Sequence, residues 1–242
     1  MRSASSYLLC GTPRTGSTLL CSLLSSTGVA GHPESYFREP DHRLWAGRFG
    51  VGVTDEGDFD YVQFVRGAVR AGSTGNGVFA ARIMWGSMHL LVEGLRHHIG
   101  GHGDVDVLER ALGPLRFVHL ERLDVVAQAV SWARAEQTGF WQEGDRSRAT
   151  AELDLDQVER LVATIHEHNQ AWRAWFAAEA VEPLGLTYES LVASPVGTVM
   201  RVLDFIRAAP PAGWAPVSPP ERQADSLSAE WVRRYRATRR GD

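Results

Sequence analysis

Short apolar runs alternate along this chain with longer amphipathic segments, and the alternation predicts its secondary structure. The apolar runs have the length of buried strands and lie at 7–10, 78–84, 115–120 and 183–188. The amphipathic segments predict helices from Ser17 onward and at 59–71, 87–98, 104–113, 124–137, 156–178, 195–206 and 228–239. Strands that alternate with helices in this way predict an α/β fold, with a mostly parallel sheet covered by helices on both faces.

Between these elements the pattern breaks in three places. Residues 28–31 are small and predict a brief strand, while 38–57 mixes glycine, aspartate and scattered aromatics as a loop or a lid does. Residues 210–220 form a proline-rich connector. Ser87 is the expected N-cap of the helix that follows it. No break marks a boundary between domains, so we expect a single domain over 1–242.

Composition narrows the function classes. The 242 residues carry a formal net charge of −4, and 44% are hydrophobic, as in an ordinary globular protein. A slightly acidic chain has no general affinity for polyanions, so nucleic acid is not an expected partner. No apolar stretch reaches the length of a membrane span, and residues 1–4 lead directly into the first strand without a signal peptide, which predicts a cytoplasmic protein. Cys10 and Cys21 are expected as buried thiols, and no metal-ligand spacing is present.

The stretch YLLCGTPRTGSTLLCSLLSST at 7–27 joins a strand to a helix through a loop bounded by Gly11 and Gly16. The first N–H groups of a helix have no intrahelical partner and carry partial positive charge, so such a loop is typical of an anion site. A nucleoside-triphosphate loop of this glycine spacing continues with lysine, whereas here a Ser-Thr pair follows and all 25 basic residues of the chain are arginine. A loop that contains Arg14 and no lysine suits a shorter anion held without a metal. The alternative is a strand–helix turn that binds nothing.

The sequence PRTGST at 13–18 resembles the 5′-phosphosulfate loop of sulfotransferases, in its Arg-containing bacterial form. The donor of these enzymes is 3′-phosphoadenosine 5′-phosphosulfate (PAPS), and their product is adenosine 3′,5′-bisphosphate. The resemblance implies that the donor's phosphosulfate is held by Pro13, Arg14, Thr15, Gly16, Ser17 and Thr18. Arg14 is further expected to stabilise the charge that builds on the bridging oxygen as the S–O bond breaks.

A second part of the pattern follows the strand at 115–120. Arg122 comes just after this strand, and Ser131 lies nine residues further on, inside the next helix. This arrangement resembles the 3′-phosphate site of carbohydrate-type bacterial sulfotransferases, where the arginine acts by charge and the serine by a hydrogen bond. The alternative is a surface arginine and a serine that bonds to its own helical turn. Because ligands of an open parallel sheet bind beyond the carboxyl ends of its strands, we expect Arg122 and the loop at 11–16 to meet at one edge.

Further stretches extend the resemblance over nearly the whole chain. They are YLLCGTPRTGSTLL at 7–20, TGVAGHPESYF at 27–37, ARIMW at 81–85, RLDVVAQAVSWARAEQTGFW at 122–141, QAWRAWF at 170–176 and ERQADSLSAEWVRRYR at 221–236. In this order they resemble the trehalose 2-sulfotransferase family of actinobacterial type. The resemblance implies the P-loop-like three-layer α/β/α fold of sulfotransferases, PAPS as donor, no metal and a tendency to form a homodimer.

Two segments are expected to complete the site. Residues 38–77 show little resemblance to the family, and we expect them to form an acceptor-side lid or insert. Residues 210–242 are expected to cover the nucleotide, with Arg222 closing over it. The later arginines at 233–240 are expected on a solvated helix face.

The family uses a glutamate just before an aromatic pair as the general base that takes the proton of the acceptor hydroxyl. An ungapped match puts Ser35 at that position and Glu34 one residue earlier, and in an extended segment one residue changes the direction of a side chain. We therefore expect Glu34 as the base, with His32 as the alternative. Arg82 occupies a strand-end position where the family usually has lysine, and it is expected to neutralise a sulfonate or leaving-group oxygen, or else to form a salt bridge.

The leading hypothesis is a PAPS-dependent sulfotransferase that acts on a hydroxyl of a sugar, a glycolipid headgroup or a small natural product. Tyr36, Phe37, Trp45 and Trp85 are candidates for stacking against this acceptor, although we expect at least half of them in the core. A phosphotransferase or kinase on a degenerate phosphate loop is a second hypothesis, which the missing lysine disfavours. A non-catalytic nucleotide-binding relative is the third, and the displaced glutamate favours it.

Overall fold

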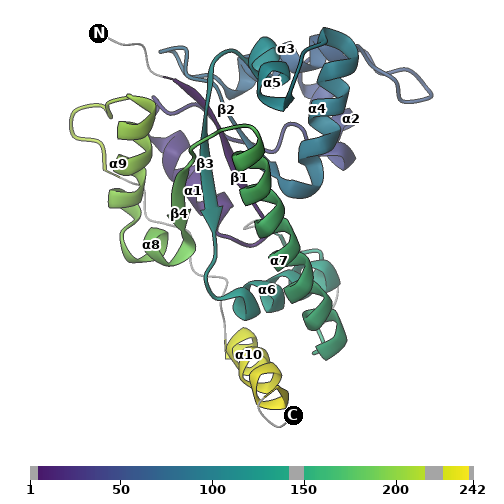
Figure 1. The fold of residues 1–242 in the computed structure, drawn as a ribbon, viewed down its shortest axis with the longest axis vertical. Helices are drawn as coiled ribbons and strands as arrows, with labels where there is room; N and C mark the ends of the chain where they lie inside the picture. The colour runs from purple at the N-terminus through teal and green to yellow at the C-terminus, as the bar shows by residue number, and fades with distance from the viewer. Residues whose placement is uncertain (1–4, 142–149, 216–225, 240–242) are drawn as a thin grey trace.

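The chain folds around a four-stranded parallel sheet. The structure is a computed structural model, and it describes residues 5–141, 150–215 and 226–239. The strands are β1 (Ser6–Gly11), β2 (Ala80–Met84), β3 (Leu115–Glu121) and β4 (Leu184–Thr187). Their order is β2-β1-β3-β4, so the first strand of the chain lies inside the sheet (Figure 1). The predicted α/β fold with a parallel sheet is confirmed.

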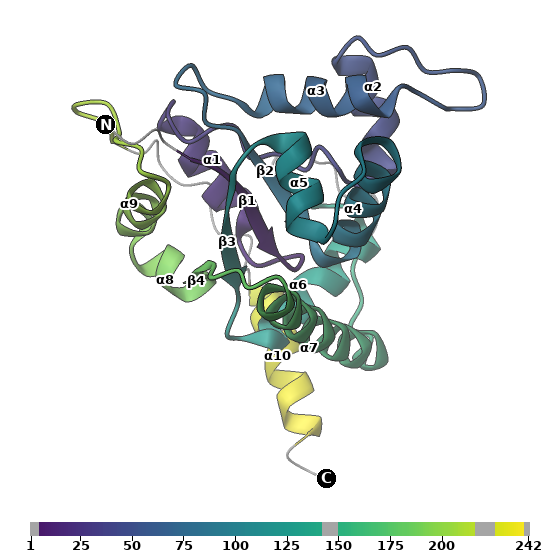
Figure 2. The same ribbon diagram turned by 45° about the horizontal axis from the view of Figure 1, so that its top comes forward.

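Helices cover both faces of the sheet, as Figures 1 and 2 show. In chain order they are α1 (Ser17–Ser26), the short 3₁₀ helix η1 (Glu39–Asp41), α2 (His42–Arg48), α3 (Tyr61–Gly72), α4 (Trp85–Ile99), α5 (Asp104–Leu112), α6 (Val125–Thr138), α7 (Leu155–Ala178), α8 (Tyr188–Ala193), α9 (Pro195–Ile206) and α10 (Ser226–Thr238). Successive residues of β1 point to opposite faces of the sheet and divide the core between them. Leu8 and Cys10 pack with α2 to α5 and α7, whereas Tyr7 and Leu9 pack with α1, α8 and α9.

A third apolar cluster joins α6, α7 and α10. It lies toward the carboxyl ends of the strands, where α6 follows β3 after a short turn (Figure 1). Trp231 and Tyr235 bury α10 in this cluster and are only 2% and 6% exposed. The C-terminal helix is therefore packed against the same helix that carries Ser131.

The structure corrects the expectations for two of the irregular segments. Residues 28–30 form bends, Gly28 and Gly31 have left-handed backbone, and the predicted brief strand at 28–31 is not formed. The segment 38–57, expected to lack regular structure, contains η1 and α2. α2 has seven residues, of which Ala46 alone is buried, so it offers too few core positions to produce a helical pattern in the sequence.

One helix starts earlier than predicted, and another helix was not predicted. The helix expected from Ser87 begins at Trp85, with Met84 as its N-cap residue and no side-chain cap. α8 was not predicted, and it starts directly after β4 with a capping box between Thr187 and Ser190. The connector expected at 210–220 continues beyond the described residues after 215, and Arg222 lies outside them. Among the described residues, no helix has both the length and the apolar character needed to cross a bilayer.

Candidate functional site

The loop between β1 and α1 contains two residues with left-handed backbone. Arg14 has φ +67° and Gly16 has φ +81°, which is costly for any residue except glycine. A Cβ atom on Gly16 would lie 2.6 Å from Cδ2 of Tyr188, so a larger residue must displace that ring. Gly16 is also the N-cap residue of α1 and has no side chain that can accept the first helical N–H groups. The positive end of α1 is therefore available to an anion at this loop.

α7 fixes the loop from the interior of the protein. Trp172 is fully buried, and its Nε1–H donates to the carbonyl oxygen of Gly11 at 2.9 Å. Thr12 Oγ1 donates to Asn169 Oδ1 at 2.9 Å, and both of these residues are buried as well. Buried hydrogen bonds of this kind hold a loop in one conformation, because breaking one leaves a polar group without a partner. The loop is thus preorganised before any ligand binds.

α6 and the turn before it meet the loop from the β3 side. Ser131 Oγ accepts a hydrogen bond of 2.9 Å from Arg14 Nε, and Arg122 Nη1 donates to the carbonyl oxygen of Arg14 at 3.4 Å. Gln128 Nε2 donates to the carbonyl oxygen of Pro13 at 2.7 Å. The structure thus brings Arg122 and Ser131, which lie 108 and 117 residues from Arg14 in the chain, against the loop. The guanidinium of Arg14 lies on the Ser131 side of the loop.

Tyr188 and Glu189, at the start of α8, support Arg122, and neither was predicted as a site residue. The guanidinium carbon of Arg122 lies 4.4 Å from the centre of the Tyr188 ring, in a cation–π contact. Glu189 accepts the backbone N–H groups of Leu123 and Asp124 at 3.1 and 3.3 Å, which fixes the turn that Arg122 begins. A tyrosine directly after a strand that ends at the same sheet edge is the one signal that points to this contact.

Arg122 has an unusual environment for a charged group. Its Nε is buried and has no hydrogen-bond partner within the described parts of the chain. Burial lowers the pKa of Arg122, while the charges of Tyr188, Asp124 and Glu189 raise it. A half-buried guanidinium with an unused N–H donor suits a bound anion, which supplies both an acceptor and a compensating charge.

Arg82 meets the loop from the other side, through β2. Its Nη1 donates to Thr18 Oγ1 at 2.9 Å, in the first turn of α1, and its Nε donates to Ser35 Oγ at 2.8 Å. No carboxylate of the described chain lies within ion-pairing distance of Arg82, so the salt bridge that was the alternative for this residue is not formed. Arg82 is thereby placed between α1 and the segment that carries Glu34.

Glu34 lies beside β2 and close to α1. It forms a single parallel bridge with Ala81, and its carbonyl oxygen accepts the N–H of Arg82 at 2.9 Å. Burial raises the pKa of the Cys21 thiol in α1, and the charges of Arg82 and Glu34 lower and raise that pKa respectively. The Glu34 side chain is exposed and acts electrostatically on α1 one turn past its start. His32, also exposed, belongs to the same segment.

Two of the four candidate aromatic residues belong to the core. Tyr36 and Phe37 are 2% and 1% exposed, and Tyr36 donates its hydroxyl to the carbonyl oxygen of His32 at 2.8 Å. Trp45 packs edge-on against Tyr36 with ring centres 4.9 Å apart, and Trp85 packs edge-on against Trp172 at 5.0 Å. The expectation that at least half of the four are core residues is therefore confirmed, and Trp45 and Trp85 are partly exposed.

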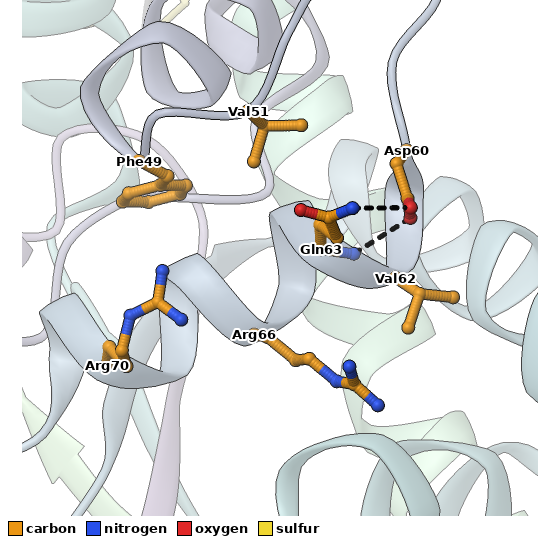
Figure 3. Close-up of a pocket in the computed structure, with 7 residues that line it drawn as sticks. All are labelled: Phe49, Val51, Asp60, Val62, Gln63, Arg66 and Arg70. Atoms are coloured by element: carbon orange, nitrogen blue, oxygen red, sulfur yellow. Dashed lines mark hydrogen bonds between the residues drawn. The ribbon is translucent and has the colours of Figure 1, made fainter.

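A separate cavity of about 290 Å³ lies between α3 and the chain at 49–51 (Figure 3). Its lining residues are Phe49, Val51, Asp60, Val62, Gln63, Arg66 and Arg70. None of them was predicted as a site residue, and all belong to the 38–77 segment. Asp60 is engaged at the start of α3, where it accepts the backbone N–H and the side-chain amide of Gln63.

The glycine-bounded loop at the start of α1, flanked by arginines from β2 and from the β3–α6 turn, is typical of α/β proteins of the P-loop-like class. Sequence comparison then identifies the family. The Stf0 sulphotransferase family matches residues 6–238, and the chain belongs to this family. The protein is therefore a sulfotransferase.

Two relatives cover nearly the whole chain. The trehalose 2-sulfotransferase of Mycobacterium tuberculosis (strain Erdman) is 35% identical over 263 aligned positions, which cover 98% of this chain and 96% of that protein. The trehalose 2-sulfotransferase of Mycolicibacterium smegmatis is 33% identical over 95% of this chain and 94% of that protein.

Similar solved structures are more distant in sequence. A sulfotransferase domain from the curacin biosynthetic pathway is 15% identical, covers 95% of this chain and 82% of its own, and has a TM-score of 0.49. A sulfotransferase from Alicyclobacillus acidocaldarius is 16% identical, covers 98% and 96% of the two chains, and also has a TM-score of 0.49.

Proposed function

We propose that this sulfotransferase takes its sulfuryl group from PAPS and transfers it to a hydroxyl group of a sugar, a glycolipid headgroup or a small natural product. The observation that carries the proposal is the contact of Arg122 and Ser131 with the loop at 11–16. PAPS differs from adenosine 5′-phosphosulfate by its 3′-phosphate, and Arg122 offers that group the positive charge of a half-buried guanidinium and an unused Nε–H donor. Ser131 adds a hydroxyl on the same side.

The other end of the donor fits the start of α1. Ser17 and Thr18 begin the helix, and the hydroxyl of Thr15 is buried without a hydrogen-bond partner in the described chain. Backbone N–H groups and hydroxyls in a fixed loop stabilise negative charge without having to reorganise, which is how such a site accelerates a transfer reaction. Pro13 and Gly16 shape this loop, and Arg14 stands between its two ends.

PAPS supplies the sulfuryl group, and the residues on the β2 side act on the acceptor. Glu34 is proposed to take the proton of the acceptor hydroxyl as its oxygen bonds to sulfur, with His32 as the alternative base. Arg82, held by Thr18 and Ser35, is proposed to neutralise charge on the sulfuryl oxygens or on the bridging oxygen that leaves with adenosine 3′,5′-bisphosphate.

The named activity of the two mycobacterial relatives supports a sugar hydroxyl as the acceptor. The 38–77 segment, which contains α2 and α3, is proposed as the acceptor-side insert. Coverage of the nucleotide by 210–242 with Arg222, a homodimer and a cytoplasmic location stay predictions.

Calorimetry and a transfer assay test the proposal together. We expect the protein to bind adenosine 3′,5′-bisphosphate at least about tenfold more tightly than adenosine 5′-monophosphate, because a charge-assisted hydrogen bond contributes about 1.5–3 kcal/mol. Tighter binding of ATP with Mg²⁺ than of the bisphosphate would refute the donor assignment. Binding of the bisphosphate without sulfuryl transfer to any acceptor in a sugar and glycolipid screen would favour the non-catalytic alternative.

A further inference from the structure

The carboxylate of Asp124 links the turn before α6 to the C-terminal helix, in addition to the apolar cluster that packs α6 against α10. Asp124 is the N-cap residue of α6, and its Oδ1 accepts the backbone N–H of Ala127 at 3.0 Å. The same Oδ1 accepts a hydrogen bond of 2.7 Å from Nη2 of Arg236 in α10. One oxygen atom therefore both caps the start of α6 and accepts a hydrogen bond from α10.

An exposed ion pair of this kind is usually weak, because ordering two mobile side chains offsets most of the attraction. Here the backbone of Arg236 is already ordered by its neighbours. Trp231 and Tyr235 are buried between α10 and its partner helices, and Tyr235 and Arg239 both bond to Glu159 of α7. The packing of α10 thus holds the guanidinium of Arg236 beside Asp124.

Asp124 also stands two residues from Arg122, and its charge acts on that arginine. A free carboxylate at this position competes for the Arg122 guanidinium and draws it away from the loop. In the structure Arg122 instead faces the Arg14 carbonyl oxygen and the Tyr188 ring, while the Asp124 carboxylate is paired with Arg236.

We propose that Arg236 is a positioning residue for the 3′-phosphate subsite: by occupying the Asp124 carboxylate, it leaves Arg122 directed toward the donor. This inference rests on the proposed function, since it presumes that Arg122 binds the donor's 3′-phosphate. Arg236 itself touches neither the loop nor Arg122 among the contacts of the described residues. Its effect therefore passes through Asp124.

The measurement is the 3′-phosphate preference, defined as the ratio of the dissociation constants for adenosine 5′-monophosphate and adenosine 3′,5′-bisphosphate. Arg236→Ala is expected to lower this ratio by about two- to fivefold, within the range measured for exposed ion pairs. Arg236→Lys keeps the charge and is expected to recover most of the ratio. Arg233→Ala is the matched control, because Arg233 is exposed on the same helix and makes no ion pair or hydrogen bond with any described residue.

A second variant distinguishes positioning from simple loss of helix docking. Asp124→Asn keeps an N-cap side chain of similar strength but removes the competing charge. We expect Asp124→Asn to hold a preference equal to or above that of the wild type, and Arg236→Ala to have no further effect in that background. If α10 only stabilises α6 by packing against it, Arg236→Ala lowers the 3′-phosphate preference equally in the wild-type and the Asp124→Asn proteins, and the inference is overturned.

The outcomes distinguish a failure of the donor assignment from a failure of the positioning role of Arg236. A wild-type protein with no 3′-phosphate preference refutes the donor assignment itself. A wild-type preference that survives Arg236→Ala, or an Arg236→Ala variant that loses both ligands equally, overturns the positioning role and leaves the donor assignment standing. An Arg236→Ala protein that does not fold moves the decision to Asp124→Asn, where a lowered preference contradicts the inference.

Discussion

Replacing Gly16 by alanine tests the central geometry of the site, because Gly16 combines a left-handed backbone with a close neighbour. Its φ is +81°, and an alanine Cβ would lie 2.6 Å from Cδ2 and 3.1 Å from Cε2 of Tyr188. The left-handed conformation costs alanine about 1–2 kcal/mol by itself. Displacing the Tyr188 ring then removes its cation–π contact with Arg122, which contributes about 0.5–2 kcal/mol.

Gly28 provides a matched control for the free-energy cost of placing alanine in a left-handed backbone conformation. It has φ +67°, and a Cβ there would meet nothing within 4 Å. Gly28→Ala should therefore lower the free energy of unfolding by about 1–2 kcal/mol and leave nucleotide binding unchanged. Gly16→Ala should lower it by about 1.5–4 kcal/mol, the sum of the backbone cost and the lost cation–π contact, and should also weaken binding of adenosine 3′,5′-bisphosphate about tenfold or more.

Denaturant unfolding followed by circular dichroism gives the first quantity, and calorimetric titration with the bisphosphate gives the second. In a Tyr188→Ala background, Gly16→Ala should lose only the backbone term, because the clashing ring is gone. Equal destabilisation by Gly16→Ala and Gly28→Ala, or unchanged bisphosphate binding in Gly16→Ala, would refute the reasoning that Gly16 makes room for the ring that supports Arg122.

The remaining predictions concern the two sides of the loop and its supports. Glu34→Gln should lower kcat while the dissociation constant for adenosine 3′,5′-bisphosphate stays unchanged; unaltered turnover removes Glu34 as the base. Arg82→Ala should lower mainly kcat, whereas Arg122→Ala should weaken bisphosphate binding by about 1.5–3 kcal/mol, and steady-state kinetics with calorimetry separates the two effects. Trp172→Phe leaves a loop carbonyl oxygen without its buried donor and should lower the free energy of unfolding by about 1–3 kcal/mol in denaturant titration. Burial lowers the pKa of His119 from 6.5, so the unfolded chain binds this proton more readily, and stability should fall as pH drops below about 6.5. His119→Gln should flatten that slope in unfolding curves measured across pH; an unchanged slope contradicts the assignment to His119.

The sequence predicts the loop and its relation to Arg122 and Ser131 because both follow from local patterns. A short apolar run, two glycines and a following amphipathic segment specify strand, loop and helix without long-range information. The placement of Arg122 needs only one further rule, that parallel strands end at a common edge, and this rule bridges a chain separation of 108 residues. Ser131 lies inside the following helix, and it was predicted from its resemblance to the 3′-phosphate site of sulfotransferases.

Tyr188 and Glu189 show where such reasoning stops. They lie in the six-residue helix α8, which is too short to display a hydrophobic period, and β4 before it has only four residues. Their importance comes from what they touch, namely the Gly16 backbone and the turn after β3. No property of a tyrosine–glutamate pair in the sequence specifies those neighbours. Likewise, α2 buries a single residue, and its contribution to the aromatic cluster around Tyr36 appears only in three dimensions.

The strand order places Arg82 and Arg122 on opposite sides of the loop at 11–16. β1 lies between β2 and β3, so the loop that follows it is approached from both sides. Arg82 reaches Thr18 from the β2 side, and Arg122 reaches Arg14 from the β3 side. Glu34 pairs with the outer edge of β2, so the proposed base and Arg82 share one side, and the proposed 3′-phosphate residues share the other. Under the proposed function, the sulfuryl group starts at the loop before α1 and passes toward the β2 side, while the 3′-phosphate stays on the β3 side. Substitutions on the β3 side are therefore expected to change affinity for the nucleotide, and substitutions on the β2 side to change the rate of transfer.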